Sequence, residues 1–425
     1  MNPSSEATLG RMGLLVIGGG IAGLTAAIEA AEAGCDVILV EKEHHLGGRV
    51  ARMNQYFPKL CPPACGLEIN FRRLKQNPRV TVLTGAQVES LAGAPGDYTA
   101  TVAVAPRHVT EACTLCGECV KVCPAERPDE FNYGLGTTKA VYLPTATAYP
   151  ARYAIERSAC PAGCDACAKA CAYGAVDLNQ QPRKETFRVA AVIAATGWAP
   201  YDAKRIDNLG FGVVPNVVTN VMFERMAAPT GPTGGKILRP SDGKEPRSVA
   251  FVQCAGSRDE NHLPYCSAVC CAASLKQTTY VRAALPEAKV TVYYIDIRTS
   301  GRLEDFYARV SEDPMLSLVK GKVAKVEADK ASGGVVLEVE DVMGGRKLRE
   351  TVDLLVLATG IVPQTKGLPG AALDEFGFVA TPPGKTGFYG AGCVHRPEEV
   401  SATVQDATGA ALKGLQCVVR SGHHG

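Results

Sequence analysis

Gly18-Gly19-Gly20-Ile21-Ala22-Gly23 is the stretch that decides the fold of this 425-residue chain. The apolar run Leu14–Ile17 precedes it, an alanine-rich helical stretch spans 24–31, and a second apolar run spans 36–41. Strand, glycine turn, helix and strand form a βαβ unit in which the G-x-G-x-x-G pattern opens the helix. The sequence therefore predicts an α/β fold with a Rossmann-type dinucleotide-binding domain at its start.

Each glycine of this pattern has a separate physical task. Gly18 permits the tight turn, Gly20 lets the backbone approach a pyrophosphate, and Gly23 lets the helix pack closely on the strand. The helix N-terminus stabilises the phosphate charge, and Glu41, at the end of the next strand, would accept the ribose hydroxyls. We expect the loop contacts to come from Gly18, Gly20, Ile21, Ala22 and Gly23.

The segment after Glu41 favours FAD over NAD. His45-Leu46-Gly47-Gly48-Arg49 resembles the Gly-Gly-Arg continuation of two-dinucleotide-domain flavoproteins, where this segment lies along FAD. The resemblance implies that Lys42, Gly48 and Arg49 belong to the cofactor site. It also implies further FAD contacts at two Ala-Thr-Gly turns and one C-terminal turn: Ala195, Thr196, Gly197, Ala358, Thr359, Gly360, Gly392 and Cys393. Cys393 departs from the pattern, because those flavoproteins usually carry an Asp there that holds the ribityl chain.

Two cysteine runs give the strongest signal in the chain. Cys113, Cys116, Cys119 and Cys123 have the spacing of the bacterial ferredoxin run, and Cys160, Cys164, Cys167 and Cys171 repeat it with one extra residue in the first gap. In such pairs the fourth cysteine binds the other cluster. We therefore predict two [4Fe–4S] clusters, with Cys171 joining the first run and Cys123 joining the second. Zinc knuckles are the alternative.

A third group consists of Cys254, Cys266, Cys270 and Cys271. Cys254 follows a predicted strand, at the place where a pyridine-nucleotide domain would carry its own glycine loop, and no such loop is present. We predict a third cluster here, with four buried packing cysteines as the alternative. Cys61 and Cys65 remain open between a redox dithiol, a contribution to a cluster and a rigid proline turn. No Ser/His/Asp constellation stands out, so no side chain is predicted to be catalytic and the chemistry is assigned to cofactors.

The domain organisation follows from these motifs. We expect the first part of the FAD domain at 1–105, a ferredoxin-like insertion with two [4Fe–4S] clusters at 106–182, and the FAD-domain return with a linker at 183–245. A second nucleotide-type domain with its cysteine group would span 246–355, and the FAD-domain closure and tail 356–425. Within the second domain, strands are predicted at 248–253, 290–295 and 352–358, with a helix at 272–284.

Charge and hydropathy exclude several partners. Lys and Arg number 45 against 43 Asp and Glu, so no net field favours nucleic acid or an acidic membrane surface. No uninterrupted apolar stretch is long enough to span a membrane. The first residues lack the pattern of an export signal, so we expect a cytoplasmic protein that reaches a membrane only through a partner.

Together these motifs resemble the A subunits of heterodisulfide reductases. The stretches Phe57–Arg73 and Gln253–Cys266 are more similar to the QmoA family, the flavoprotein subunits of the quinone-interacting membrane-bound oxidoreductase of sulfate reducers. That resemblance implies a sister flavin and iron–sulfur subunit of the QmoB type and a haem-bearing membrane subunit of the QmoC type. It also implies electron exchange between menaquinone and adenylylsulfate (APS) reductase.

Two other enzymatic functions stay open at this point. One is a role in another heterodisulfide-reductase-like complex of the same subunit type, including a flavin-bifurcating one. The other is an NAD(P)H-dependent flavoprotein oxidoreductase, which would need a second glycine fingerprint that the sequence lacks. A protein whose cofactors serve assembly alone is a third, non-enzymatic alternative.

Overall fold

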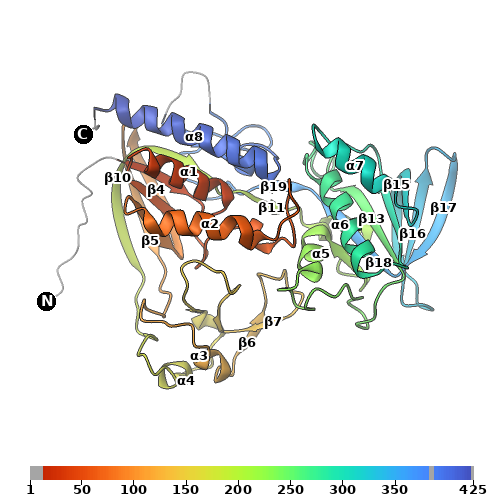
Figure 1. Cartoon of the computed structure of the whole chain (residues 1–425), viewed down its shortest axis with the longest axis horizontal. Coiled ribbons are helices and arrows are strands. Elements are labelled where there is room, and N and C mark those ends of the chain that lie inside the picture. The colour runs from red at the N-terminus through yellow and green to blue at the C-terminus, as the bar shows by residue number, and fades with distance from the viewer. Residues whose placement is uncertain (1–12, 382–386, 423–425) are drawn as a thin grey trace.

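The computed structural model describes residues 13–381 and 387–422. Figure 1 shows three parts: a sheet flanked by long helices on the left, a second sheet with its helices on the right, and a loop-rich module below the first sheet. Residues 1–12, which are expected to carry no export signal, lie outside the described residues.

The first sheet has the order β3-β2-β1-β10-β5-β4, with β20 also paired to β10. Strands β3, β2, β1, β10 and β20 are parallel, and β5 and β4 are added antiparallel. Its strands are β1 (Gly13–Ile17), β2 (Val37–Glu41), β3 (Val80–Thr84), β4 (Ala86–Ala94), β5 (Asp97–Val104), β10 (Arg183–Ala194) and β20 (Phe388–Gly390). The predicted strands at 14–17 and 36–41 are confirmed.

Strand β10 shows why this sheet forms. In its first half, which pairs with β5, only Phe187 is buried, whereas residues 189–194 are all buried beside β1 and β20. A strand covered on both faces reads as a continuous apolar run, which is the pattern of Val189–Ala194.

Three helices cover the first sheet: α1 (Ile21–Glu32), α2 (Pro63–Gln76) and α8 (Val400–Arg420). Figure 1 shows α8 beside α1 along the same layer, with α2 adjacent. Helix α8 packs closely because Gly414 faces Leu14 and Ile193, where an added Cβ would lie 3.1 Å from a Leu14 methyl carbon. Its first turn is capped by Glu399, which accepts hydrogen bonds from the amides of Ser401 and Ala402.

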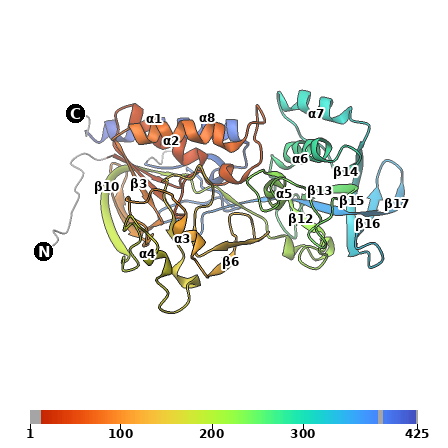
Figure 2. The ribbon, with the colours of Figure 1, turned by 60° about the horizontal axis from the view of Figure 1, so that its bottom comes forward.

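The ferredoxin-like module lies between β5 and β10 in the chain and forms the lower part of Figures 1 and 2. Its elements are all short: α3 (Glu118–Lys121), β6 (Glu126–Pro128), β7 (Thr137–Lys139), β8 (Val141–Tyr142), β9 (Ala154–Ile155), the 3-10 turn η2 (Arg157–Ala159) and α4 (Ala166–Lys169). Because so little regular structure is present, its small core is built largely around cysteines, including Cys119, Cys123 and Cys167.

The second sheet has the order β12-β18-β13-β14-β15-β16-β17, parallel as far as β15 and antiparallel beyond it. Its strands are β12 (Val217–Thr219), β13 (Ser248–Ala255), β14 (Lys289–Tyr294), β15 (Leu316–Ala328), β16 (Val335–Asp341), β17 (Arg346–Val352) and β18 (Leu354–Thr359). Helices α5 (Asn220–Ala227), α6 (Cys270–Ala284) and α7 (Leu303–Ser311) accompany it. The predicted second-domain strands and helix are confirmed within a few residues.

The domain boundaries differ from the expected ones on both sides of the second domain. Strand β12 and helix α5 lie in the region expected to be FAD-domain return and linker, yet β12 pairs with β18 in the second sheet. Strand β18 itself extends to Thr359, past the expected boundary at 355. A three-residue strand carries too little periodicity to be assigned to a sheet from sequence, and pairing with a strand far along the chain decides its place.

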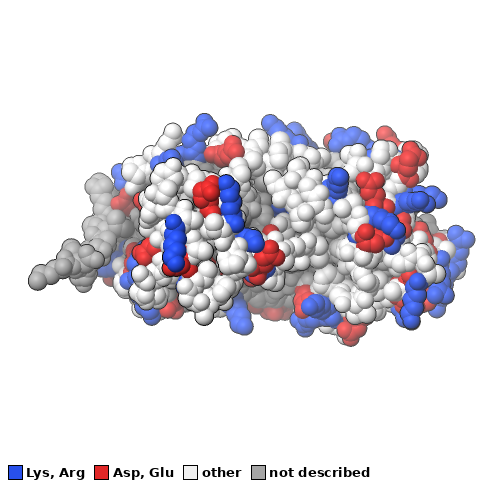
Figure 3. All heavy atoms as spheres, turned by 90° about the horizontal axis from the view of Figure 1, so that it is seen from below, with Lys and Arg blue, Asp and Glu red and all other residues white. Residues whose placement is uncertain are grey.

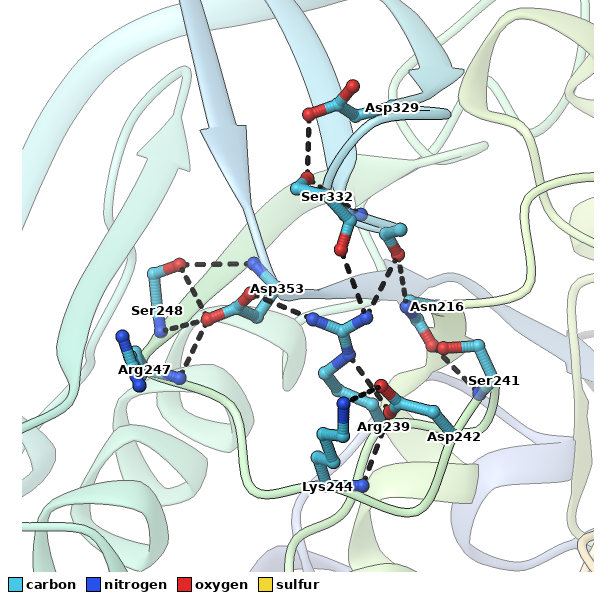
Figure 4. A network of polar contacts seen from close by, with 12 residues as sticks. Asn216, Arg239, Ser241, Asp242, Lys244, Arg247, Ser248, Asp329, Ser332 and Asp353 are labelled. Atoms are coloured by element: carbon cyan, nitrogen blue, oxygen red, sulfur yellow. Dashed lines mark hydrogen bonds and ion pairs between the residues drawn. The ribbon is translucent and has the colours of Figure 1, made fainter.

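Two short antiparallel strands connect the domains, β11 (Trp198–Pro200) and β19 (Ile361–Pro363). In Figure 1 they lie between the two sheets. The remaining short turns are η1 (Val50–Arg52), η3 (Ala203–Arg205), η4 (Asp207–Leu209) and η5 (Gly392–Val394). The stretch 229–245, within the region expected to hold the linker, has no regular element, and Figure 4 shows it held by Arg239, which contacts Asp353 and Asp242.

In the described part of the chain, no helix is both long and apolar enough to cross a membrane. On the face shown in Figure 3, Lys and Arg alternate with Asp and Glu, and neither sign forms a continuous patch. This distribution agrees with the balanced charge of the sequence.

Candidate functional site

The glycine loop has the geometry that a dinucleotide pyrophosphate requires. A Cβ on Gly23 would lie 1.7 Å from the Gly18 carbonyl oxygen, and a Cβ on Gly18 would lie 2.3 Å from the Ala195 carbonyl oxygen. Those two glycines are thus needed for packing within the protein. A Cβ on Gly20 would meet only Gly48, at 3.8 Å. Gly20 therefore leaves open space at the N-terminus of α1, where a phosphate would fit.

Glu41 lies where the ribose is expected. Its side chain is buried at the end of β2 and accepts hydrogen bonds from the amides of Gly19 at 2.6 Å and Glu43 at 2.8 Å. Burial raises the pKa of Glu41, and these two donors oppose that effect. Each carboxylate oxygen keeps a second lone pair, so the fold orients Glu41 and leaves it able to accept ribose hydroxyls.

Arg49 contacts Trp198, the residue that follows the first Ala-Thr-Gly turn. Its Nε donates to the Trp198 carbonyl at 2.5 Å, its Nη1 donates to the Tyr133 hydroxyl at 2.9 Å, and its guanidinium stands 4.8 Å from the Trp198 ring centre. Burial lowers the pKa of Arg49. No carboxylate is among these contacts, so an anionic cofactor would find a cation already held in place.

The C-terminal turn also reaches the glycine loop. Gly392 has a φ of +68°, and a Cβ there would lie 3.0 Å from the Ala22 Cβ. Cys393 is buried and its thiol donates to the Glu398 carbonyl. The carboxylate at this turn is that of Asp406, which accepts from the Gly392 amide at 2.7 Å. Asp406 orders the turn from α8, while Cys393 is bonded within its own loop.

The second Ala-Thr-Gly turn lies at the end of a strand of the second sheet. Ala358 and Thr359 end β18 in the second sheet, and Thr359 donates to Asn220 at 3.1 Å. A Cβ on Gly360 would lie 2.3 Å from the Ser257 hydroxyl oxygen. The structure therefore brings this turn to the third cysteine group, whereas Ala195, Thr196 and Gly197 stay beside the first glycine loop.

The two ferredoxin runs share one local design. Each places its third cysteine, Cys119 or Cys167, in a four-residue helix, α3 or α4, and each fourth cysteine follows that helix closely. One pocket is lined by residues from both runs. Its walls are Val109, Cys113, Thr114, Cys116, Glu118, Cys119, Tyr153, Cys171, Tyr173, Ala175 and Val176. Cys171 thus lies with the first run, the arrangement that crossed ligation requires.

The second run has the reciprocal arrangement. Burial raises the pKa of both Cys160 and Cys167, and the neighbouring thiol of Cys123 acts in the same direction on each. Arg157 lies here too and donates to the Cys164 carbonyl at 3.1 Å. Among the described residues, no three His, Cys, Asp or Glu side chains are arranged to hold a single metal ion. Two observations therefore favour clusters here: the pocket that both runs line, and the Cys123 thiol beside Cys160 and Cys167.

The third cysteine group forms at the carboxyl edge of the second sheet. A bulge near the end of β13 gives Cys254 a φ of +55°, and Cys270 and Cys271 open α6. Burial raises the pKa of Cys254 to about 11, Arg258 opposes this, and Cys271 and Cys266 reinforce it. Burial also raises the pKa of Cys270, with all three other thiols acting in the same direction. Four thiols that influence one another's pKa supply the number of donors that a [4Fe–4S] cluster needs.

Strained backbone is concentrated at the cysteine groups. Seven non-glycine residues of the described chain have positive φ: Leu60, His108, Leu115, Tyr133, Cys254, Arg258 and Ala268. Leu115 lies inside the first ferredoxin run, and the last three lie in the third group. Such conformations cost about 1–3 kcal/mol each and persist where the surroundings hold them, commonly at functional sites.

Cys61 and Cys65 lie at the start of α2, next to Tyr56. A Cβ on Gly66 would lie 2.2 Å from the Tyr56 hydroxyl, and the thiols of Cys65 and Cys61 add to the burial that raises the pKa of Tyr56. Cys65 is exposed. The two thiols thus share one neighbour, and the choice among dithiol, cluster ligand and proline turn remains a prediction.

Sequence reasoning did not identify Trp198, Gln364 or Asp406. Gln364 accepts from Lys42 at 2.8 Å and donates to the Trp198 carbonyl at 3.0 Å, so it joins β19 to the end of β2. These residues come from distant parts of the chain, and no local spacing relates them. The chain's single Trp, directly after Gly197, was the one available signal.

Comparison with protein families agrees with this geometry. Residues 13–87 match the FAD dependent oxidoreductase family, and residues 106–126 match the 4Fe-4S binding domain. The chain is 38% identical over 421 residues to the A subunit of the ferredoxin/F420H2-dependent CoB-CoM heterodisulfide reductase of Methanosarcina acetivorans, covering 95% of this chain and 53% of that protein. It is also 38% identical over 416 residues to the iron-sulfur A subunit of the CoB–CoM heterodisulfide reductase of Methanocaldococcus jannaschii, covering 93% of this chain and 63% of that protein.

The chain therefore spans about half to two thirds of the length of these relatives. Among solved structures, thioredoxin reductase of T. acidophilum matches with a TM-score of 0.52 at 14% identity, over 95% of this chain and 97% of that one. Lactococcus lactis thioredoxin reductase gives the same TM-score at 12% identity, over 96% and 100%. At such identities the likeness concerns the fold. The chain is an oxidoreductase with a thioredoxin-reductase-like FAD-dependent fold and a [4Fe–4S] ferredoxin domain, and its close homologues are A subunits of heterodisulfide reductases.

Proposed function

We propose that this chain is an electron-transfer subunit that joins FAD on the first domain to two [4Fe–4S] clusters in the inserted module and a third in the second domain. The observation that carries the proposal is the third cysteine group. Cys254, Cys266, Cys270 and Cys271 gather at the edge of the second sheet where a nicotinamide domain would bind its dinucleotide. FAD exchanges two electrons and each cluster one, so together they would convert between two-electron and one-electron partners.

The protein residues would bind and tune these groups. Gly20 would leave room for the pyrophosphate in the turn that Gly18 and Gly23 shape, Glu41 would hold the ribose, and Arg49 would supply a buried cation. Arg258 pairs with Asp296 and lies next to Cys254. Its positive charge would stabilise the thiolate form of the cysteine, which burial disfavours. Asp259 in the same loop lies 3.8 Å from Lys322 and would repel a dinucleotide phosphate.

We infer further that the chain belongs to a QmoA-like complex that passes electrons between menaquinone and APS reductase. The stretches Phe57–Arg73 and Gln253–Cys266 support this choice. The partners would be a QmoB-like flavin and iron–sulfur protein and a QmoC-like haem protein in the membrane, which would bring the chain to the cytoplasmic face. The second candidate is membership of a heterodisulfide-reductase-like complex, favoured by 38% identity to A subunits of that kind.

The experiment is reduction of the anaerobically purified complex by menaquinol, followed by flavin absorbance and by cluster EPR. Flavin bleaching together with new cluster signals, passed on to APS reductase, would support the QmoA-like role. Electron transfer to CoB–CoM heterodisulfide without reaction with menaquinol would instead support the second candidate. Reduction of the isolated chain by NADH or NADPH would contradict both.

A further inference from the structure

The contact between the two domains contains a buried ion pair. Lys276 of α6 lies 2.9 Å from Glu224 of α5, with side chains that are 5% and 9% exposed. Glu224 also accepts from Gln277 at 2.8 Å and from the Tyr280 hydroxyl at 3.3 Å. A buried carboxylate is stable only when it is paired and hydrogen-bonded, and Glu224 has both kinds of partner.

The first domain completes this network through backbone atoms. The Asn54 amide donates to Glu224 at 2.9 Å, and Lys276 donates to the Gln55 carbonyl at 2.6 Å. Because the segment contributes only a backbone N–H and a backbone C=O, the network holds the backbone at 54–55 and contacts no side chain there. The side chains that make these two contacts are those of Glu224 and Lys276.

Apolar contacts extend the same attachment. Phe57 and Leu60 pack against the cluster of Leu275, Phe306 and Val310, and the Phe57 ring meets Phe306 edge-on, with ring centres 5.1 Å apart. On the other side of α5, Arg225 donates to Asn132 of the ferredoxin-like module at 2.7 Å. Interfaces between domains of one chain allow relative motion unless they are well packed. This interface combines a buried ion pair, apolar packing and a hydrogen bond to the ferredoxin-like module.

The position of the network gives it a task. Segment 54–55 follows η1 and Gly48–Arg49 in the chain, and Gly48 and Arg49 would line the proposed FAD site. Lys276 lies within two turns of Cys270 and Cys271 on α6. We infer that Glu224 is a positioning residue, whose buried carboxylate fixes the FAD-side segment 54–55 at one distance from the third cysteine group. This inference rests on the proposed function, because a fixed distance serves electron transfer between the two sites.

Four variants test the role of Glu224 in the full chain. Glu224→Gln removes the charge, Tyr280→Phe removes one hydroxyl with less risk to folding, and Glu224→Gln with Lys276→Met removes both charges. Asp353→Asn is the matched control. Asp353 also accepts several hydrogen bonds, from Arg239 and from the amides of Arg247 and Ser248, and all its partners in Figure 4 lie in the second domain.

The first readout is amide hydrogen exchange of segment 53–57, which needs no cofactor. Loss of the charged acceptor should speed exchange at Asn54 by roughly tenfold to hundredfold. Tyr280→Phe should have a smaller effect of the same kind, and the double variant should speed exchange less than Glu224→Gln alone, because it leaves no unpaired buried charge. Asp353→Asn should leave this segment unchanged.

The second readout is the rate at which flavin electrons, delivered by a light pulse, reach the clusters in cofactor-loaded protein. Glu224→Gln should slow this rate while flavin and iron content stay at the wild-type level. The inference fails if Glu224→Gln leaves both readouts unchanged, or if Asp353→Asn alters them equally. A wild-type chain that lacks iron or flavin would overturn the proposed function, and the exchange result at Asn54 would still decide the role of Glu224 in the domain contact.

Discussion

Substituting Gly20 by Ala should separate cofactor binding from folding. Gly20 has φ −76° and ψ −172°, which any residue adopts, and an added Cβ would meet only Gly48 at 3.8 Å. Gly20 is also the N-cap of α1, where Ala is less favourable than Gly. The smaller entropy of the unfolded chain offsets this, so the free energy of unfolding of the apoprotein should change by less than about 1 kcal/mol.

The same substitution should weaken FAD binding clearly. The new methyl group would occupy the space into which the pyrophosphate must come to reach the amides of α1. Losing one hydrogen bond to a charged phosphate costs about 1.5–3 kcal/mol, which corresponds to a roughly tenfold to hundredfold higher Kd. Gly23→Ala is the contrasting variant. Its Cβ would lie 1.7 Å from the Gly18 carbonyl oxygen, so it should destabilise the apoprotein by about 1–3 kcal/mol or more.

The assay is FAD titration of apoprotein, followed by quenching of flavin fluorescence, together with chemical denaturation of each apoprotein. Weak FAD binding with unchanged stability for Gly20→Ala, and lost stability for Gly23→Ala, is the expected pair of results. Full FAD binding by Gly20→Ala would refute the assignment of the pyrophosphate to this loop. Equal destabilisation by both substitutions would refute the steric argument.

Three further predictions follow from the site. Cys171→Ser should damage the cluster bound by Cys113, Cys116 and Cys119, because Cys171 lines their pocket; EPR showing loss confined to the Cys160 cluster would reject crossed ligation. NADH and NADPH should not bleach the flavin of the isolated chain in stopped flow, since Cys254 and Asp259 stand where a glycine loop would be; rapid stoichiometric bleaching would favour a dehydrogenase. Burial lowers the pKa of His44 to about 4 and of His45 to about 3, so both are neutral in the fold and protonate first in the unfolded chain. Apoprotein stability should therefore fall as pH drops from about 6.5 towards 4, and His45→Phe should flatten this slope in denaturation curves; an unchanged slope would assign it to other groups.

The predictable parts of the fold are those that depend on motifs of neighbouring residues in the sequence. The βαβ unit at 13–41 follows from a glycine motif between two apolar runs, and the ferredoxin-like insertion follows from cysteine spacing. The place of β12 did not follow, because three residues carry no usable periodicity and their partner, β18, lies far along the chain. Asp406 and Gln364 were missed for a related reason. Gln364 bonds to Lys42, 322 residues earlier in the chain, and the crossing of β19 brings it there. Asp406 bonds to Gly392, 14 residues earlier, and the packing of α8 against that turn brings it there.

The second Ala-Thr-Gly turn shows a different limit of sequence reasoning. The same three residues follow strands in both sheets, and the pattern predicts a turn after a buried strand in each. It does not say which ligand site lies beside that turn. In the structure, Gly360 packs on Ser257 of the third cysteine group, while Ala195 packs on Gly18 of the glycine loop.

Iron, zinc, acid-labile sulfide and flavin content of the anaerobically purified chain tests the central claim most directly. Three [4Fe–4S] clusters and one FAD predict about twelve iron atoms, about twelve sulfides and about one flavin per chain, with negligible zinc. About eight iron atoms would show that the group at Cys254 packs without a cluster. Zinc in place of iron and sulfide, or protein that binds no flavin, would contradict an electron path between FAD and iron–sulfur clusters in this chain.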